Sequence, residues 1–344
     1  MCQRLRSCAV DSKKGARHRF LRYNLLMNGP VTVIGGANMD INGFSRDPIN
    51  MLDSNPGRVE YCPGGVGRNI AENLHRLGAE VRFISVIGDD PGGVLLRNSS
   101  ARMGLNIEHS LFVNNSGQAT SVYIALMDSN GEMKLALADM EILEQMTTEH
   151  LESKAGIIKE SAIVLLDTNL PERIINFILD RYGSGPLFFL DPVSARKAPK
   201  AASRIGSFDT IKLGRMEASI LSGIEVPKMV TSFGPDTNLE KTANQLIDKG
   251  VRRVFITLGK EGVYAARAGK SFFSPIRHVS TLNTSGGGDA FMAGIVYGTL
   301  RGWDDETIVS FSLTMAGITV QSKSAVSPEM CLELVEKNMK YDKE

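Results

Sequence analysis

The feature that most constrains the fold is a regular alternation of strand-like and helix-like segments after Ala162. Short apolar runs typical of buried strands occur at Ile163–Asp167, Leu187–Asp191 and Val254–Leu258. Helix-like segments alternate with them at Pro171–Leu179, Arg215–Leu221 and Leu239–Lys249. Parallel strands need a long crossover connection, usually a helix. The alternation therefore predicts βαβ units and an α/β fold with a mainly parallel sheet.

Three consecutive glycines, Gly286, Gly287 and Gly288, precede Asp289 and a helix-like segment that starts at Ala290. Glycines before a helix leave backbone N–H groups bare, and with the positive end of the helix dipole these groups form an anion hole. The dipole is expected to favour the ionised form of Asp289, which is then able to accept a proton from an attacking hydroxyl. The stretch predicts phosphoryl transfer, although a Gly-rich turn capped by Asp also fits it.

Polar residues follow the first buried strand, Val31–Gly35, in the order Asn38, Met39, Asp40. Ligands of open α/β sheets bind beyond the carboxyl ends of the strands. An amide and a carboxylate two residues apart point the same way and can hold neighbouring sugar hydroxyls. A β-turn built on Asn and Asp is the alternative.

A second Gly-rich stretch, Gly64-Gly65-Val66-Gly67-Arg68-Asn69, opens an amphipathic helix that Gly78 ends. Its glycines let a substrate approach the backbone, and the Asn69 amide can reach a hydroxyl. A dinucleotide site would need such glycines directly after the first strand, so that reading is disfavoured.

Together these two stretches resemble the signatures of the ribokinase/PfkB family of carbohydrate and nucleoside kinases. The first signature reads G-G-x-G-x-N-x-A, and the second usually reads D/N-T-x-G-A-G-D, with Gly287 here in place of Ala. The resemblance runs from about Pro30 to the C-terminus. It implies a ribokinase-like three-layer αβα sandwich with a mainly parallel sheet and a small β lid.

The lid is expected from residues of about 42–62 and 112–140. Two β-rich runs in the second segment flank Asn130-Gly131, a strong hairpin signal. A plain edge hairpin of the main sheet is the alternative. The predicted kinase domain is 30–344, and it is expected to form a homodimer through the lid.

The resemblance also implies roles for single residues. Asn38, Asp40, Gly64, Gly65 and Asn69 would hold the sugar, with Asp289 as the base and Gly286–Gly288 around the transferring phosphoryl group. The residues implied in ATP binding are Lys212, Glu217, Thr257, Gly259, Gly262, Gly286 and Gly288. Adenine is expected near the loop between Gln321 and Ser327.

ATP and Mg²⁺ are the implied cofactors, with Glu217 acting indirectly on the metal. This chain departs from the family pattern K-P-N-R-x-E, because Leu213 replaces Pro and Gly214 replaces Asn. K⁺ dependence is left open, because Asn283 stands where many relatives have Asp.

Several stretches resemble the pseudouridine kinases within this family. They are Asp53–Gly57, Gly64–Ala71, Gly131–Met133, Ala138–Met140 and Asp191–Ser194. The resemblance implies phosphorylation of the ribose 5′-hydroxyl of pseudouridine. Ribose, inosine or adenosine as substrate, or a sugar-binding regulator without turnover, remain alternatives, the last because of Gly214.

Composition adds limits on partners and compartment. The 344 residues carry a net charge of +1, so no nucleic-acid partner is indicated. The four cysteines form no CxxC, and no apolar run has the ~20 residues that a membrane span needs. Residues 1–29 hold seven Lys/Arg and one acid, and they are expected to be a disordered extension. We expect a cytoplasmic protein, or an organellar, mitochondrial one if residues 1–29 act as a transit peptide.

Overall fold

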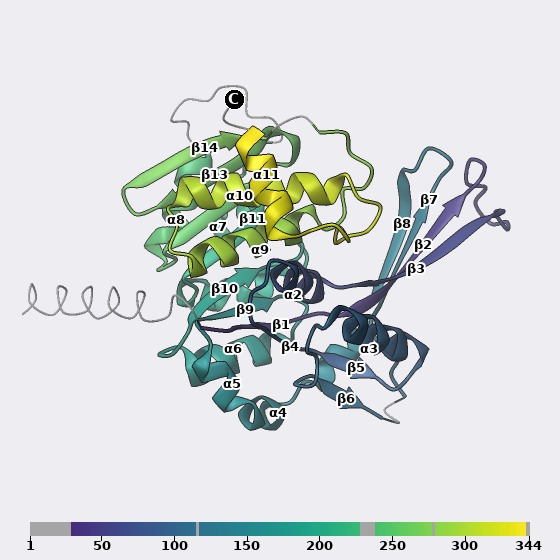
Figure 1. Cartoon of the computed structure of the whole chain (residues 1–344), viewed down its shortest axis with the longest axis horizontal. Helices are drawn as coiled ribbons and strands as arrows, with labels where there is room; N and C mark the ends of the chain where they lie inside the picture. Colours follow the sequence, from purple (N-terminus) through teal and green to yellow (C-terminus); the bar gives the residue numbers. More distant parts are fainter. Residues whose placement is uncertain (1–28, 115–116, 228–237, 277–278, 342–344) are drawn as a thin grey trace, which may run out of the picture.

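The computed structural model describes residues 29–341, apart from 115–116, 228–237 and 277–278. The predicted basic extension therefore lies outside the described residues, except for its last residue. The described part is a layered α/β structure, from which a second, smaller sheet projects (Figure 1). None of its helices is long and apolar enough to cross a membrane.

The main sheet has eight strands in the order β14-β13-β12-β11-β10-β9-β1-β4. Their bounds are β1 Val31–Ile34, β4 Val81–Ile84, β9 Ile163–Asp167, β10 Leu187–Asp191, β11 Thr210–Gly214, β12 Arg253–Thr257, β13 Gly262–Arg267 and β14 Lys270–Pro275. The pairs from β4 through β12 are parallel, and β13 and β14 add an antiparallel edge. The mainly parallel sheet is thus confirmed. Strand β11 was not predicted from the sequence, because its few apolar residues flank Lys212 and do not form an apolar run.

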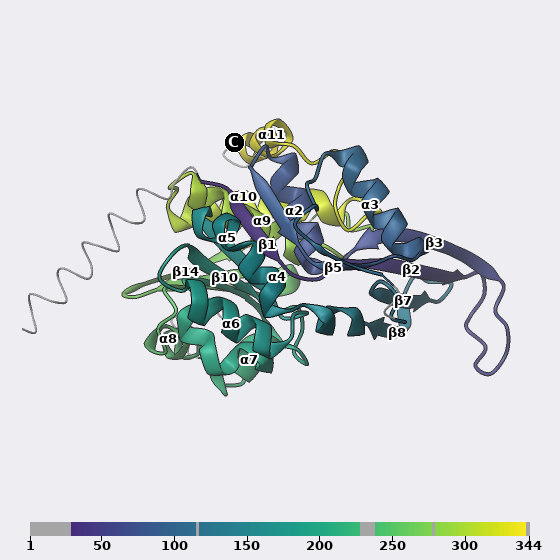
Figure 2. The same ribbon diagram turned by 90° about the horizontal axis from the view of Figure 1, so that it is seen from below.

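The central strands are apolar on both faces because helices cover both. Along β1, Val31 and Val33 pack into one hydrophobic cluster and Ile34 into the other, as period-2 alternation requires. One helical layer holds α2 Val66–Arg76, α3 Pro91–Met103, α9 Gly287–Leu300, α10 Asp305–Val320 and α11 Leu332–Tyr341. The opposite layer holds α5 Ala155–Glu160, α6 Glu172–Tyr182, α7 Arg215–Ser222 and α8 Asn238–Asp248. Figure 2 shows both layers with the strands between them.

The smaller elements complete this frame at the edges. They are α4 Thr148–Ser153 and the 3₁₀ segments Glu141–Gln145, Ala198–Ser207 and Gly259–Glu261. A two-stranded sheet joins β5 Val86–Gly88 to β6 Leu111–Val113. The start of the predicted second lid segment, at 112–113, therefore pairs with β5 and not with the lid.

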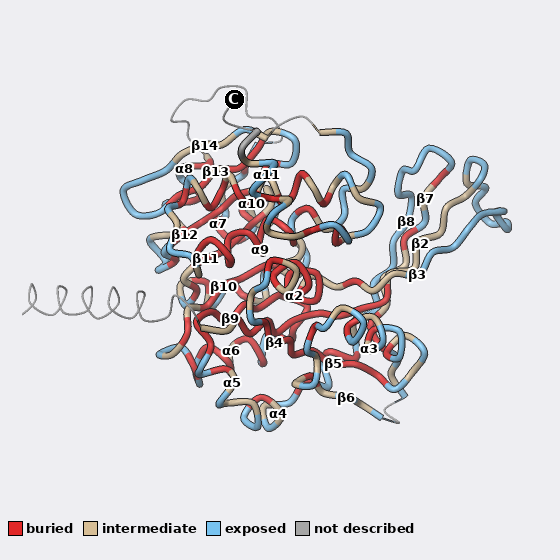
Figure 3. The backbone as a smooth tube through the Cα atoms, viewed as in Figure 1, coloured by how far each residue is buried: buried red, intermediate tan, exposed pale blue. Residues whose placement is uncertain are grey.

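The lid is a separate four-stranded sheet in the order β3-β2-β7-β8. Its strands are β2 Asn38–Ser45, β3 Gly57–Gly64, β7 Val122–Met127 and β8 Met133–Asp139. The β7–β8 pair forms the antiparallel hairpin around Asn130-Gly131, while β2 and β7 run parallel. The outer ends of these strands are exposed (Figure 3). The hairpin belongs to a lid, so the alternative of an edge hairpin of the main sheet is wrong.

Candidate active site

The loop after β1 and the Gly-rich start of α2 meet at one buried carboxylate. Asp167, at the end of β9, accepts hydrogen bonds through Oδ2 from the backbone N–H groups of Gly36 and Gly67, both at 2.8 Å. The Arg68 N–H donates to the Gly36 carbonyl at 3.1 Å. Gly65 has φ 101°, and a Cβ there would overlap the same carbonyl. Asp167 therefore fixes the strand-end loop against the start of α2, and glycine makes this close approach possible.

The predicted sugar-binding residues Asn38 and Asp40 lie at the base of the lid. Asn38 Nδ2 donates to Asp40 Oδ1 at 2.5 Å, so the two side chains point the same way. A Cβ at Gly64 would overlap the Asp40 carboxylate, so glycine leaves room for it. Burial raises the pKa of Asp40 to about 6, although the Asn38 amide and the nearby Arg68 guanidinium act in the opposite direction. The pair offers an acceptor carboxylate to a hydroxyl.

The anion-hole stretch has the geometry of a helix start. Gly286 is the residue before α9, with φ 79°, and a Cβ there would overlap the Ala325 carbonyl oxygen. The backbone N–H groups of Leu282 and Asn283 donate to the Val320 carbonyl at 2.8 and 3.1 Å. The first turn of α9 is therefore held against the loop that follows α10, with its N–H groups free of helical partners.

Asp289 lies in that first turn and joins the anion hole to the sugar side. Its Oδ2 accepts a hydrogen bond from Asn69 Nδ2 at 2.9 Å, across 220 residues of sequence. Burial, followed by repulsion from Asp191, raises the pKa of Asp289 to about 7, against the opposing effects of Lys212 and Asn69. The helix dipole was expected to favour the ionised form, but burial has the largest effect on this carboxyl group and the net shift of its pKa is upward. A carboxyl group that titrates near neutrality suits a general base.

A buried cation lies beside the anion hole. Lys212 Nζ is 2.6 Å from Asp191 Oδ2, and it would be 3.3 Å from a Cβ at Gly288. Burial lowers the pKa of Lys212, but the Asp191 and Asp289 carboxylates outweigh burial and the net shift is upward. The lysine therefore stays charged where the oxygens of a phosphoryl group would sit.

The remaining predicted nucleotide residues gather at the ends of β11 and β12. A Cβ at Gly214 would overlap Glu217 Oε2, so the Glu217 carboxylate folds back over the glycine. Thr257 donates to the Leu213 carbonyl at 3.1 Å. Gly259 and Gly262 flank the turn after β12 with φ 60° and 132°, which explains glycine at both places. The Glu217 carboxylate lies close enough to Lys212 to raise the pKa of the lysine.

The carboxylates near the anion hole limit how a metal ion can be held. Within the described residues no group of three or more His, Cys, Asp or Glu side chains has metal-site geometry. Mg²⁺ in phosphoryl-transfer sites takes one or two carboxylates plus substrate phosphates, so Glu217 beside the anion hole fits such a role.

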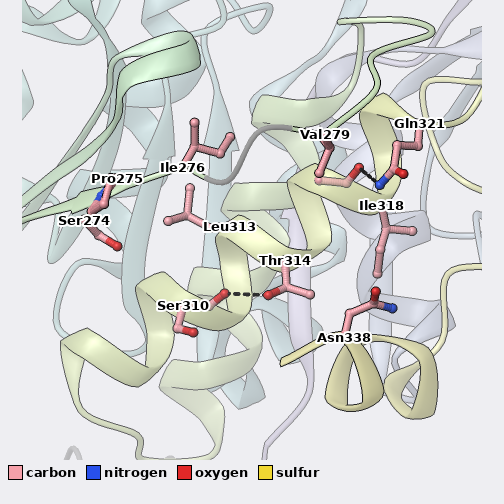
Figure 4. Close-up of a pocket in the computed structure, with 11 residues that line it drawn as sticks. Ser274, Pro275, Ile276, Val279, Ser310, Leu313, Thr314, Ile318, Gln321 and Asn338 are labelled. Atoms are coloured by element: carbon pink, nitrogen blue, oxygen red, sulfur yellow. Dashed lines mark hydrogen bonds between the residues drawn. The ribbon is translucent and has the colours of Figure 1, made fainter. Parts of the chain in front are cut away.

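A cavity of about 220 Å³ opens next to the anion hole, lined by the end of β14, α10 and α11 (Figure 4). Gly317, Ile318 and Gln321 line it, and the intervening Val320 packs against Gly287. The expected adenine position near Gln321–Ser327 thus borders a cavity.

Asp167, Asp191 and Lys197 were not among the predicted site residues. Lys197 Nζ donates to Asn169 Oδ1, and a Cβ at Gly36 would lie 2.6 Å from the Asn169 amide nitrogen. The signal was present, because polar residues follow the carboxyl ends of adjacent parallel strands. The sequence does not show which of them turn inward.

Comparisons with known proteins agree with this geometry. The model of the pfkB family carbohydrate kinases matches residues 29–330. The chain is 33% identical over 303 residues to the pseudouridine kinase of Escherichia coli (strain K12), covering 88% of this chain and 94% of that protein. It is 28% identical over 306 residues to the ribokinase of Haemophilus influenzae, covering 88% and 95%. A solved carbohydrate kinase from Agrobacterium tumefaciens superposes with a TM-score of 0.75 at 26% identity, covering 91% of this chain and 97% of that one.

A carboxylate beside an anion hole, under a lid and at the strand ends of a three-layer sandwich, defines a phosphotransferase that acts on an alcohol group. The chain belongs to the pfkB family of carbohydrate kinases. Both the family resemblance and the ribokinase-like fold are thereby confirmed.

Proposed function

We propose that the protein transfers the γ-phosphoryl group of ATP to the ribose 5′-hydroxyl of pseudouridine. The hydrogen bond between Asn69 and Asp289 supports this most directly, because it joins the sugar side to the anion hole. The choice of pseudouridine is supported by the similarity to the E. coli pseudouridine kinase and by stretches such as Asp53–Gly57 and Asp191–Ser194, which resemble those kinases.

In the proposed mechanism, Asn38, Asp40 and Asn69 hold the ribose hydroxyls. Asp289 Oδ2 is engaged with Asn69, so Oδ1 takes the proton of the 5′-hydroxyl. The lid excludes water and so limits wasteful hydrolysis of ATP.

The backbone N–H groups of Gly286–Gly288 and the Lys212 ammonium receive the oxygens of the transferring phosphoryl group. Mg²⁺, when bound, would neutralise charge on the ATP oxygens, and Glu217 would help to hold it indirectly, through water.

The test is ADP release with pseudouridine, uridine, inosine, adenosine, ribose and fructose under identical conditions. Pseudouridine should give the highest kcat/KM, and ribose a much lower one because it lacks the contacts of the base. A preference for free ribose or fructose would contradict pseudouridine as the substrate. It would remain consistent with a carbohydrate kinase of this family. Tight nucleoside binding without ADP release would instead support the alternative of a sugar-binding regulator without turnover.

The homodimer is proposed on the lid face opposite Asp40. Side chains alternate along strands, so residues paired with Ile41 share its face. Five apolar residues on this face are 39% to 64% exposed: Leu126, Val59, Leu135, Tyr61 and Leu137. Exposed apolar patches of this kind mark interaction sites, and a second copy offers the same complementary face.

Sedimentation of Leu137→Glu tests the dimer. The variant should sediment as a monomer, while Ala136→Glu, with the same new side chain on the other face of β8, should remain dimeric. Wild-type protein that sediments as a monomer at micromolar concentration would refute the interface.

A further inference from the structure

One face of α2 carries three charged residues at helical spacing, and two of them are buried. Arg68 and Glu72 are 3% and 6% exposed, and Arg68 Nη2 lies 2.9 Å from Glu72 Oε2. Arg76 pairs with the other Glu72 oxygen at 2.8 Å and also donates to the Pro328 carbonyl at 2.9 Å. The three side chains therefore form one ion network, which is tied at Pro328 to the loop after α10.

Stability alone does not explain a buried arginine at this position. A buried ion pair can often be replaced by apolar side chains without loss of stability, because charges are costly to remove from water. Within the described residues, Arg68 Nε is buried without a hydrogen-bond partner, which adds to that cost. The family signature G-G-x-G-x-N-x-A leaves position 68 open. The burial of Arg68 is therefore better explained by the groups that its guanidinium contacts.

Arg68 contacts the amide that holds the proposed base. Its Nη1 donates to Asn69 Oδ1 at 3.5 Å, while Asn69 Nδ2 donates to Asp289 Oδ2 at 2.9 Å. A guanidinium only donates and an ionised carboxylate only accepts, so these two neighbours fix the orientation of the amide. The opposite orientation would place the amide oxygen against Asp289 and the amide hydrogens against Arg68.

Arg68 also acts on the sugar side of the site. Its Nη1 donates to the Pro63 carbonyl in β3, at the base of the lid, at 3.3 Å. Burial raises the pKa of Asp40, whereas the Asn38 amide and the Arg68 charge lower it. The other titratable or charged groups that act on these two carboxyl groups are Cys62 on β3 beside Asp40, and Asp167, Asp191 and Lys212 from β9, β10 and β11 beside Asp289.

We propose that Arg68 is a positioning residue, which orients the Asn69 amide towards Asp289 while Glu72 holds its guanidinium in place. The network thus arranges the sugar side of the site before the nucleoside binds. The inference rests on the proposed function, because it assigns a further residue to the same site. Without Arg68 the amide is free to turn, and both Asp40 and Asp289 lose an interaction that favours their ionised forms. The pKa of each should then rise.

The first test measures kcat/KM for pseudouridine against pH, with saturating ATP. Arg68→Met should fold, because Glu72 keeps its pair with Arg76. It should lower kcat/KM at pH 8.5 by about 3–10-fold and move the acidic limb up by about half a pH unit, with KM for ATP unchanged. Arg68→Lys keeps the charge and should recover most of the pH shift. Arg102→Met makes the same change at an exposed position on α3 and should match wild type.

A double-mutant cycle separates orientation of the amide from the effect of charge. At pH 8.5 the wild-type Asp40 and Asp289 are both mostly ionised, because their pKa values are about 6 and about 7. In an Asn69→Ala background, Arg68→Met should then change kcat/KM by less than about twofold, because the amide that Arg68 orients is gone. The smaller loss in Arg68→Lys should disappear in the same background, so the test does not depend on the folding of Arg68→Met.

Three results would overturn the inference while leaving the kinase intact. They are an additive cycle, an acidic limb of Arg68→Met that coincides with that of wild type, and an Arg68→Lys variant as impaired as Arg68→Met. Wild-type protein that turns over no nucleoside would overturn the proposed function and this inference with it.

Discussion

The pH dependence of kcat/KM should report the ionisation of Asp289. Its pKa is raised to about 7, firstly by burial and secondly by the Asp191 carboxylate. The base acts only when ionised, so its active fraction is about one half at pH 7, about one tenth at pH 6 and about one hundredth at pH 5. The rate should therefore fall about tenfold per pH unit on the acidic side of neutrality.

Asp191→Asn tests the cause of that shift. The amide removes the repulsion, and it also leaves Lys212 without its partner at 2.6 Å, so Lys212 interacts more strongly with Asp289. Both effects favour the carboxylate. The acidic limb should move down by about one pH unit or more, and the variant should retain more of its maximal rate at pH 5.5 than wild type.

Asp248→Asn makes the same chemical change at an exposed position on α8 and should leave the profile unmoved. Profiles are measured with saturating ATP and limiting nucleoside. A flat wild-type profile from pH 5 to 8, or an acidic limb that moves upward in Asp191→Asn, would refute the reasoning.

Three further perturbations test single groups. Asp289→Asn keeps the shape of the site but removes the proton acceptor, so kcat should fall by about 10²–10⁴-fold with nucleoside affinity within a few fold; turnover within about tenfold of wild type would exclude Asp289 as the base. Gly286 has φ 79°, and Gly286→Ala places a Cβ against the Ala325 carbonyl. The free energy of unfolding, measured by chemical denaturation, should fall by about 1–3 kcal/mol, and kcat should fall by more than the loss of folded protein explains. A variant with unchanged stability and kcat would contradict this backbone geometry. Gly214→Asn should fold, because φ −81° suits any residue and the flexible end of the Glu217 side chain can shift to make room; its amide would add a polar group at the phosphates beside the Glu217 carboxylate. A rate titration should then show a lower requirement for free Mg²⁺, and an unchanged requirement would assign that role elsewhere.

The sequence predicted the parts of the site that depend on local backbone chemistry. Glycines at 64–65 and 286–288 are required by positive φ and by close approach to neighbouring groups, and such requirements leave a direct mark in the sequence. The βαβ alternation was equally readable, because both faces of the parallel strands are buried.

The parts that depend on tertiary contacts could not be predicted. Asp167 accepts hydrogen bonds from the start of α2, 100 residues away, and from the loop after β1, 131 residues away, and no local pattern encodes those partners. The raised pKa of Asp289 likewise depends on its burial and on Asp191 at the end of β10, against the opposing effect of Lys212 on β11. Residues 112–113 pair with β5 because a strand-like run does not itself specify its neighbour.

The central claim is that this site phosphorylates the 5′-hydroxyl of a nucleoside with ATP. The most direct measurement is ³¹P NMR of the reaction with ATP, Mg²⁺ and pseudouridine, recorded without proton decoupling. We predict one new phosphomonoester signal, split into a triplet by the two hydrogens on C5′, with ADP appearing in equal amount. With 5′-deoxypseudouridine, which lacks the acceptor hydroxyl, this signal should not appear and ATP should remain intact. A doublet, which indicates a secondary hydroxyl, or release of inorganic phosphate in place of the ester, would contradict the account.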